Sequence, residues 1–248
     1  MDNEKTGGSD LIIGRNAVME AIKSGREIDR MFIARGERNP AVSRLVAMCR
    51  ETGAVVKEVD SKKLDFMCGG GVHQGVALSV AAHEYATIDD IFASAKEKGE
   101  APFVIVCDEL EDPHNLGAVI RTAEAAGAHG IIIPKRRSAS LNFTVAKTSA
   151  GALEYMPVAR VPNIASALDE IKERGCWTYG ADMNGSDYKT TDFSGGVALV
   201  IGSEGMGLSR LVREKCDFIV SLPMKGKINS LNASVAAGIL MYEVSSRR

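Results

Sequence analysis

The chain contains 248 residues, of which 45% are hydrophobic and 25% charged, and its formal net charge is −2. These values are ordinary for a folded protein with one large or two modest domains, and they argue against disordered and fibrous proteins. No apolar stretch reaches the roughly 18 residues that a membrane span requires, and the opening MDNEKTGGSD is polar. We therefore expect a cytoplasmic protein that does not enter a membrane.

Cysteine and histidine spacing supports neither a metal centre nor a disulfide framework. The five cysteines are scattered without a Cys-x-x-Cys pair, and the four histidines show no ligand spacing. We expect reduced thiols and no bound metal. The small net charge provides no long-range attraction for nucleic acid, so any surface that binds it would have to be local.

The hydrophobic spacing in the first third of the chain predicts a small α/β domain at residues 8–82. Its expected helices lie at 17–24, 40–52 and 61–67, and its expected strands at 30–34, 54–59 and 75–81. Residues 83–101 are more charged and hold one amphipathic helix, so we interpret them as a linker.

Residues 102–248 repeat a strand-helix pattern, which predicts a second domain. Its expected strands lie at 103–110, 130–134, 156–161, 176–182, 196–202 and 218–222, with helices at 116–127, 146–153, 164–174 and 208–214 and a last one ending near 244. The first strand, FVIVCDEL, is almost continuously apolar, as buried parallel strands are. Periodicity alone therefore predicts an open, doubly wound parallel sheet with ligands at the carboxyl ends of its strands.

Polar residues follow the first of these strands. In EDPHNLGAVIRTAEAAGAHG, Asn115 lies at the expected helix start and Arg121 about two turns later. The small residues of this helix would let another backbone or subunit approach closely. Arg121 could serve chemistry, or it could form an ion pair with Glu124 or Asp112, as arginines on helices commonly do.

The strand at 196–202 runs into SEGMGL, a glycine-rich turn with Glu204 as its one carboxylate. Its order, G-x-x-G-x-G, differs from the dinucleotide fingerprint G-x-G-x-x-G, and the chain has no Walker A sequence. Nucleotide loops of those two kinds are therefore excluded. The turn could hold a ligand against its backbone, or its glycines could serve only the positive φ angles of a tight turn.

The end of the chain, IVSLPMKGKINSLNASVAAGILMYEV, reads as a short strand, a Lys/Gly loop and a helix. Four polar residues, Asn229, Ser230, Asn232 and Ser234, fall in the expected opening turn of the helix, where backbone N–H groups lack partners and the helix dipole is positive. These side chains could cap the helix or hold a ligand. This segment alone does not separate the two possibilities.

Taken in order, DPHNLGAVIRTAEAAG, LVIGSEGMGL and LPMKGKINSLNASVAAGILMYEV resemble motifs one, two and three of the SpoU (TrmH) family of RNA 2′-O-ribose methyltransferases. The stretch from LIIGRNAVMEAIKSG to GVHQGVALSVAAHEY resembles the ribosomal-protein-L30e-like substrate-binding domain of the 23S rRNA guanosine-2′-O-methyltransferase subgroup. Together the two resemblances cover nearly the whole chain.

The resemblance implies an α/β fold in which an L30e-like RNA substrate-binding domain precedes a SPOUT-type methyltransferase domain with a trefoil knot, a rare exception to the rule against knots. It also implies S-adenosylmethionine as cofactor, RNA as substrate, and a homodimer with active sites near the subunit interface. The implied cofactor contacts are Thr178, Gly180, Ile201, Gly202, Val220, Leu222 and Leu231. The implied active-site residues are Asn115, Arg121, Glu204, Ser230 and Asn232.

The implied reaction is an in-line attack of a ribose 2′-oxygen on the sulfonium methyl group, which requires alignment and removal of the hydroxyl proton. Arg121 matches the family's base, yet a guanidinium keeps its proton up to about pH 12. Either its surroundings force Arg121 to be neutral, or it anchors an RNA phosphate and stabilises the alkoxide while Glu204 or water takes the proton. We favour the second role. Asn115, Ser230 and Asn232 would then orient the reacting groups.

The implied substrate is a guanosine of 23S rRNA, with a ribose in tRNA or elsewhere in rRNA as the alternative. A protein of another class, an RNA-binding assembly factor without turnover, is disfavoured because all five polar motif positions are filled. Aromatic residues make up only 5% of the chain, so we expect little base stacking and more contact with the RNA backbone or with flipped bases.

Overall fold

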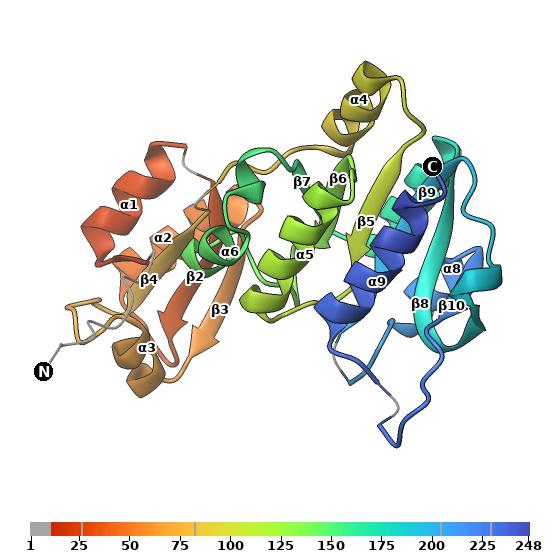
Figure 1. Ribbon diagram of the computed structural model, residues 1–248. Coiled ribbons are helices and arrows are strands. Elements are labelled where there is room, and N and C mark those ends of the chain that lie inside the picture. The colour runs from red at the N-terminus through yellow and green to blue at the C-terminus, as the bar shows by residue number, and fades with distance from the viewer. Residues whose placement is uncertain (1–10, 26, 82, 204, 229) are drawn as a thin grey trace, which may run out of the picture. The chain divides into compact units, whose positions relative to one another are not determined.

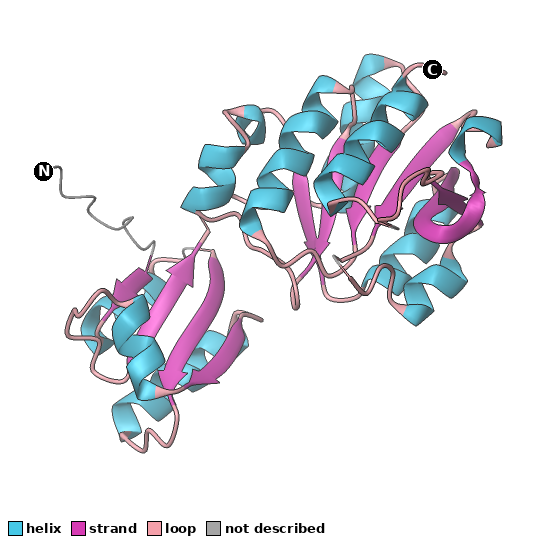
Figure 2. Cartoon of the chain, turned by 60° about the horizontal axis from the view of Figure 1, so that its bottom comes forward, coloured by secondary structure: helices cyan, strands magenta, loops and turns pink. Residues whose placement is uncertain are grey.

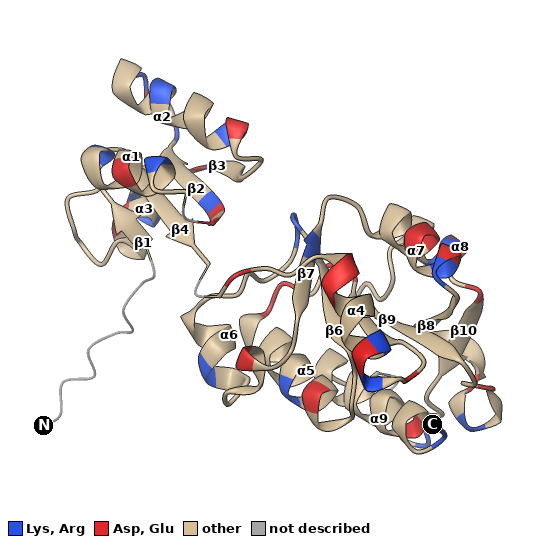
Figure 3. Ribbon diagram, turned by 90° about the horizontal axis from the view of Figure 1, so that it is seen from above, with Lys and Arg blue, Asp and Glu red and all other residues tan. Residues whose placement is uncertain are grey.

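The computed structural model describes residues 11–25, 27–81, 83–203, 205–228 and 230–248. The chain folds as two compact units, Met1–Glu84 and Tyr85–Arg248 (Figure 1). No helix among the described residues is both long enough and apolar enough to span a membrane. In the view of Figure 3, basic and acidic residues are interspersed over the helices of both units, in keeping with the small net charge.

The first unit is a four-stranded mixed sheet with helices on both faces. Its elements are β1 (Leu11–Ile13), α1 (Arg15–Lys23), β2 (Ile28–Ala34), α2 (Pro40–Glu51), β3 (Val55–Val59), α3 (Ser61–Met67) and β4 (Val76–Val80). The strand order is β1-β4-β2-β3, in which only β2 and β3 pair in parallel. Because side chains alternate along a strand, Met31 and Leu78 face the core under α1 and α2, while Phe32 and Ala77 face α3.

The second unit is a six-stranded parallel sheet of order β10-β8-β9-β5-β6-β7. Its helices are α4 (Ile88–Lys98), α5 (Pro113–Ala125), α6 (Phe143–Thr148), α7 (Ile164–Glu173), α8 (Arg210–Lys215) and α9 (Ala233–Ser245). Its strands are β5 (Phe103–Cys107), β6 (Gly130–Pro134), β7 (Val158–Val161), β8 (Cys176–Asp187), β9 (Gly196–Ile201) and β10 (Phe218–Ser221), and short 3-10 turns span Ala152–Glu154 and Tyr188–Thr190.

Helices cover both faces of the larger sheet, as Figure 2 shows. One core joins the sheet to α5, α6 and α9, and a second core on the opposite face joins it to α4, α7 and α8. Every residue of β5, β6 and β9 is buried, which explains why these strands read as continuous apolar runs. The parallel sheet predicted from the sequence is confirmed.

Residues 83–101, which we expected to act as a linker, contain α4. The apolar side of α4 is buried against β6 and β7, with Ile91 filling the space that a side chain at Gly130 would occupy. On the outer side, Arg174 and Asp89 form an ion pair at 2.6 Å. The charged residues that suggested a linker therefore form the solvent face of an amphipathic helix of the second unit.

β8 is longer than the strand expected at 176–182, and it is irregular. β10 pairs first with residues 179–180 and then with residues 186–187, so residues 181–185 of β8 bulge out between the two paired stretches. Bulges re-aim the side chains of a strand and are frequent beside functional sites. This one lies where the carboxyl ends of β8, β9 and β10 meet.

Candidate active site

A cavity of about 650 Å³ opens at the carboxyl ends of β8, β9 and β10. Its size lies within the range of small-molecule sites, roughly 300–1,000 Å³. Three separate segments and α9 form the wall. The lining residues are Ala181, Asp182, Met183, Ile201, Gly202, Ser203, Gly205, Met206, Gly207, Val220, Leu222, Met224, Ser230, Leu231, Asn232, Ala233, Ala236 and Leu240. The wall is mainly apolar with a few polar groups, which is the usual composition of a ligand site.

The turn after β9 brings bare backbone to the cavity. Ser203 and Gly207 hydrogen-bond to each other through both backbone N–H groups, each at 3.0 Å. A Cβ atom at Gly202 would overlap the carbonyl carbon of Gly207, so only glycine fits there. Two stretches of main chain in this turn are therefore packed directly on each other at the edge of the cavity.

Asp108 holds the base of this turn together. It directly follows β5 and is only 3% exposed. Its backbone N–H donates to the carbonyl of Ile201 at 2.7 Å, and its Oδ2 accepts from the backbone N–H of Ser209 at 2.7 Å. Burial raises the pKa of this carboxyl, and the hydrogen bond from Ser209 partly offsets that rise. Asp108 is not among the site residues expected from the sequence, although its position directly after a buried apolar strand was the available signal.

Asn115 and Asn232 join α5 to α9, which lie side by side in Figure 1. The Nδ2 of Asn232 donates to the Oδ1 of Asn115 at 3.0 Å, and the Nδ2 of Asn115 donates to the Oδ2 of Asp112 at 3.2 Å. Asn232 also caps α9, because its Oδ1 accepts from the backbone N–H groups of Ser234 at 2.9 Å and Val235 at 3.3 Å. The helix start thus has its cap, while Ser230 and Asn232 also line the cavity.

Arg121 is exposed on α5 and does not belong to the described lining of its own chain's cavity. Within the described part of the chain it has no ion pair within 4 Å, so the structural pairing with Glu124 or Asp112 that we considered is not formed. Glu204, the fifth polar residue implied by the resemblance, lies outside the described residues.

The residues implied as cofactor contacts separate into two groups. Five of them line the cavity: Ile201, Gly202, Val220, Leu222 and Leu231. Thr178 and Gly180 do not. Thr178 is fully buried and its hydroxyl is hydrogen-bonded to Asp217 at 2.8 Å, and the side of Gly180 that a Cβ would occupy faces Leu208 and Cys216.

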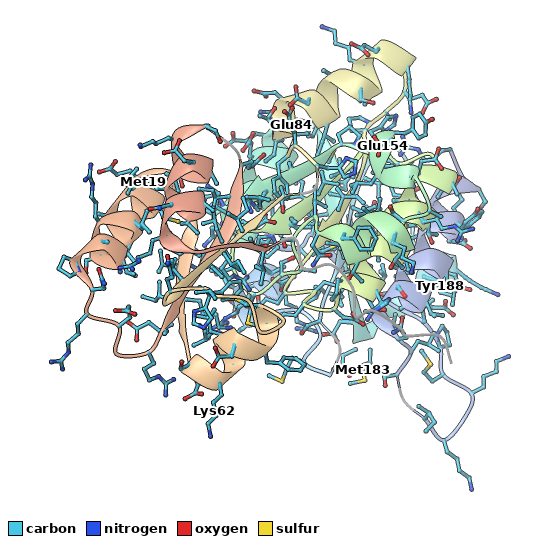
Figure 4. The ribbon with its side chains drawn as sticks, turned by 90° about the vertical axis from the view of Figure 1, so that its left-hand side faces the viewer. Met19, Lys62, Glu84, Glu154, Met183 and Tyr188 are labelled. Carbon is cyan, nitrogen blue, oxygen red and sulfur yellow. The ribbon has the colours of Figure 1, made fainter. Side chains whose placement is uncertain are left out.

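Because the strand bulges beyond Gly180, β8 reaches the cavity through Ala181, Asp182 and Met183 instead. Met183 is among the side chains labelled in Figure 4. β8 contributes the carboxylate of Asp182 to the wall, and this carboxylate forms an ion pair with Arg213 of α8 at 3.4 Å.

Comparison with known proteins identifies this arrangement. Residues 102–242 match the model of the SpoU rRNA methylase family, and residues 11–86 match the model of the RNA 2′-O ribose methyltransferase substrate-binding domain. The chain belongs to the SpoU rRNA methylase family. It is 52% identical, over 96% of both chains, to a putative TrmH family tRNA/rRNA methyltransferase of Bacillus subtilis.

Solved SpoU structures share the fold. The SpoU methyltransferase AviRb of Streptomyces viridochromogenes in complex with AdoMet is 27% identical with a TM-score of 0.60, covering 95% of this chain and 89% of that one. The AdoMet-bound rRNA methyltransferase of Sinorhizobium meliloti is 26% identical with a TM-score of 0.59, covering 94% and 85%. The TrmH/SpoU tRNA modifying enzyme of A. aeolicus is 27% identical with a TM-score of 0.54, covering 60% and 75%.

As a SpoU methylase, the chain is an S-adenosylmethionine-dependent RNA methyltransferase, and its second unit has the SPOUT trefoil-knot fold. The cavity suits this cofactor, because its volume of about 650 Å³ and apolar lining residues such as Leu222 and Leu231 would accommodate an adenosyl group. Asp182 adds a negative charge to the wall, which is compatible with a sulfonium cation. Periodicity did not predict the knot, because it reports which face of an element is buried and not the path that the chain takes between elements.

Proposed function

We propose that the protein methylates the 2′-hydroxyl of a ribose in structured RNA, and that the natural target is a guanosine of 23S rRNA. The observation that carries the proposal is the cavity, which is lined by motifs two and three. At its edge, Asn232 of motif three is hydrogen-bonded to Asn115 of motif one. A substrate-binding domain of RNA 2′-O ribose methyltransferases precedes this site in the same chain. We place the reaction in the cytoplasm.

Bound S-adenosylmethionine would supply an electrophilic methyl group, and the chain's own residues would align the ribose and remove its proton. The Asn232–Asn115 bond fixes the start of α9 against α5, which keeps the wall of the cavity in place for an in-line attack. Ser230 lies in that wall with an exposed hydroxyl that could orient the ribose. We assign Arg121 to the RNA phosphate and the developing alkoxide, and the proton to Glu204 or to water.

We also propose that the enzyme is a homodimer built on α5 and α9. Val235, Ile239 and Tyr242 of α9 are exposed and recur at a spacing that places them on one side of the helix. Burying such a stripe against a second copy would remove apolar surface from water. The exposed position of Arg121 on the neighbouring helix would allow Arg121 of the partner subunit to complete the cavity.

Mixed dimers test this arrangement. Chains carrying Arg121→Ala and chains carrying Gly202→Ala should each be inactive alone. In the first case both sites of the dimer lack Arg121, and in the second case both sites have an altered turn. When the two are co-expressed, about one site in four should combine an intact turn with Arg121 of the partner subunit and regain activity. If the mixture stays inactive while size measurements show dimers, Arg121 does not act across the interface.

We favour rRNA over tRNA as the substrate because of the share of this chain that aligns with each kind of enzyme. The S. meliloti rRNA methyltransferase aligns with 94% of this chain, whereas the A. aeolicus tRNA modifying enzyme aligns with 60%. The substrate-binding unit is therefore a feature that this chain shares with an enzyme described as acting on rRNA. A tRNA ribose or another rRNA ribose is the alternative within the same chemistry.

Mapping of 2′-O-methyl groups in a strain that lacks the gene tests the substrate. We expect one guanosine of 23S rRNA to lose its methyl group and to regain it when the wild-type gene is restored, but not when the gene carries Arg121→Ala. Loss of a tRNA methyl group instead would correct the substrate. If no ribose loses a methyl group, the proposed function is wrong.

A further inference from the structure

Two large apolar side chains in the described part of the first unit are strongly exposed. Phe66 on α3 is 87% exposed, and Val72 in the loop between α3 and β4 is 80% exposed. Leaving a phenylalanine side chain in water forgoes roughly 1.5–3 kcal/mol of burial. The core of the unit does not need either side chain, because α3 already packs on the sheet through Leu64 and Cys68.

Two lysines lie near Phe66 on its own helix. Lys62 and Lys63 precede it by four and three residues, the spacing at which side chains of an α-helix are neighbours. Figure 4 shows Lys62 extending from α3 into the solvent. Among the described residues, neither lysine has an ion pair within 4 Å. Asp60 is hydrogen-bonded to the backbone N–H of Lys62 and Asp65 to His73, so the acidic groups of this helix are already engaged.

A histidine clamp fixes the loop to α3. The Nδ1 of His73 accepts from the backbone N–H of Gly75 at 3.0 Å, which assigns the ring proton to Nε2. That Nε2 lies 2.8 Å from the Oδ1 of Asp65 and donates to it. Asp65 precedes Phe66 and His73 follows Val72, so this bond holds together the two segments that carry the exposed side chains.

The far side of the loop is also held. The Oε1 of Gln74 accepts from the backbone N–H of Arg15 at 3.1 Å, and Gln74 has a φ of 52°, a value that non-glycine residues rarely adopt. A Cβ atom at Gly71 would overlap the side chain of Ile13, so the loop packs closely on β1. The loop is therefore ordered in advance of any partner, which lowers the entropic cost of binding.

We infer that Phe66, Val72, Lys62 and Lys63 form an RNA docking surface, on which an unpaired base stacks against Phe66 while the two lysines contact the flanking phosphates. This inference rests on the proposed function, and it assigns to one face of the first unit the recognition of single-stranded RNA. An exposed ring beside two lysines that have no ion pair with a described residue matches the base faces and phosphates of an RNA loop. Val72 provides a second apolar contact beside the base.

RNA binding by the full-length protein tests the surface, with transcribed 23S rRNA as the probe in filter-binding assays. Phe66→Ala should weaken binding about 5- to 100-fold, which corresponds to a stacking contribution of ~1–3 kcal/mol. Phe66→Tyr keeps the ring and should bind within about twofold of the wild type. Tyr155→Ala, which removes an equally exposed ring from the second unit, serves as the matched control and should not change binding.

The lysines and the kinetic constants give independent readouts. Replacing Lys62 and Lys63 by glutamine should lower the slope of log affinity against log salt by about 0.7 for each lysine. In methyl transfer, Phe66→Ala should raise KM for RNA and leave both kcat at saturating RNA and the affinity for S-adenosylmethionine unchanged. A thermal unfolding midpoint equal to that of the wild type would show that the fold is intact.

Several results would overturn the inference. RNA affinity of Phe66→Ala within twofold of the wild type would do so, as would an equal loss in Phe66→Tyr. A change in oligomeric mass without a change in RNA affinity would assign the surface to a second copy of the chain. If the wild type binds rRNA through Phe66 but transfers no methyl group, the proposed function fails while the docking surface stands. If the wild type methylates rRNA and Phe66→Ala has the same RNA affinity and the same KM, only the docking surface fails.

Discussion

Each unit of the protein carries a glycine-rich turn, and the two turns present opposite surfaces. The turn at 202–207 lines a cavity with backbone and is closed at its base by Asp108. The loop at 68–75 is pinned by the side chains of His73 and Gln74, and it exposes Val72 beside Phe66. The difference teaches that glycine alone does not define the kind of site: one turn borders a cavity with main chain, while the other loop is held by side chains and exposes apolar groups to solvent.

Substitution of Arg121 should have the largest effect, because Arg121 is assigned both to the developing alkoxide and to the RNA phosphate. Arg121→Ala should lower the rate of methyl transfer about 10²- to 10³-fold, the usual loss when a group that stabilises developing charge is removed. Arg121→Lys should also lose more than tenfold, because an ammonium cannot replace a planar guanidinium. Single-turnover rates with labelled cofactor measure both. Arg210→Ala, at an exposed arginine of α8, is the control, and a near wild-type rate for Arg121→Lys would contradict the assigned role.

The next largest effect tests the turn at 202–207. Gly202→Ala should weaken S-adenosylmethionine binding about 100-fold, because its methyl group would overlap Gly207 and force the turn to move. Gly226→Ala is the matched control, since a Cβ at Gly226 meets no atom within 4 Å. Calorimetry measures both affinities. rRNA binding should stay at the wild-type level in both variants; if Gly202→Ala reduces it equally, the division of labour between the two turns is wrong.

A smaller loss should follow from opening the base of the turn. Asp108→Ala leaves the N–H of Ser209 without its acceptor, at a cost of about 1–3 kcal/mol, so cofactor affinity should fall roughly tenfold. Asp108→Asn keeps an acceptor oxygen and should bind the cofactor within about threefold of the wild type. Equal losses in the two variants would show that the negative charge, rather than the hydrogen bond, holds the turn.

Asp108 should also make stability depend on pH. Because burial raises its pKa in the native state, the native state binds this proton more tightly than the unfolded chain does. The stability contributed by the protonated form is therefore complete below the unfolded pKa and is lost as pH rises through the native pKa. Denaturant unfolding of the wild type should show this fall, and Asp108→Asn should show less of it. An identical pH profile would mean that Asp108 is not perturbed.

The smallest effects come from two matched helix caps, one in each unit. Asn39 caps α2 by accepting from the N–H of Ala41 at 2.9 Å, as Asn232 caps α9. Replacing either asparagine by alanine should cost about 1 kcal/mol in the free energy of unfolding. Asn232→Ala should in addition lower methyl transfer, because the bond to Asn115 is lost, whereas Asn39→Ala should keep full activity. Similar activities in the two variants would show that Asn232 only caps α9 and has no further role in methyl transfer.

The sequence indicated the parallel sheet correctly, because continuously apolar strands such as FVIVC can only be buried on both faces. It could not indicate the bulge in β8, which depends on the register of β10, a strand more than thirty residues away. The family resemblance implied Thr178 and Gly180 as cofactor contacts, while the structure places Asp182 and Met183 of the same strand at the cavity. The composition suggested little base stacking, but a count of aromatic residues does not reveal that Phe66 is exposed.

The most direct test of the account is the chemical position of the transferred methyl group. The purified protein is incubated with methyl-labelled S-adenosylmethionine and transcribed 23S rRNA, and the RNA is then hydrolysed with alkali. Because alkaline cleavage requires a free 2′-hydroxyl, the account predicts that the label appears in an alkali-resistant dinucleotide with guanosine on its 5′ side. Label in a mononucleotide with a methylated base, or no transfer to RNA, would contradict the central claim.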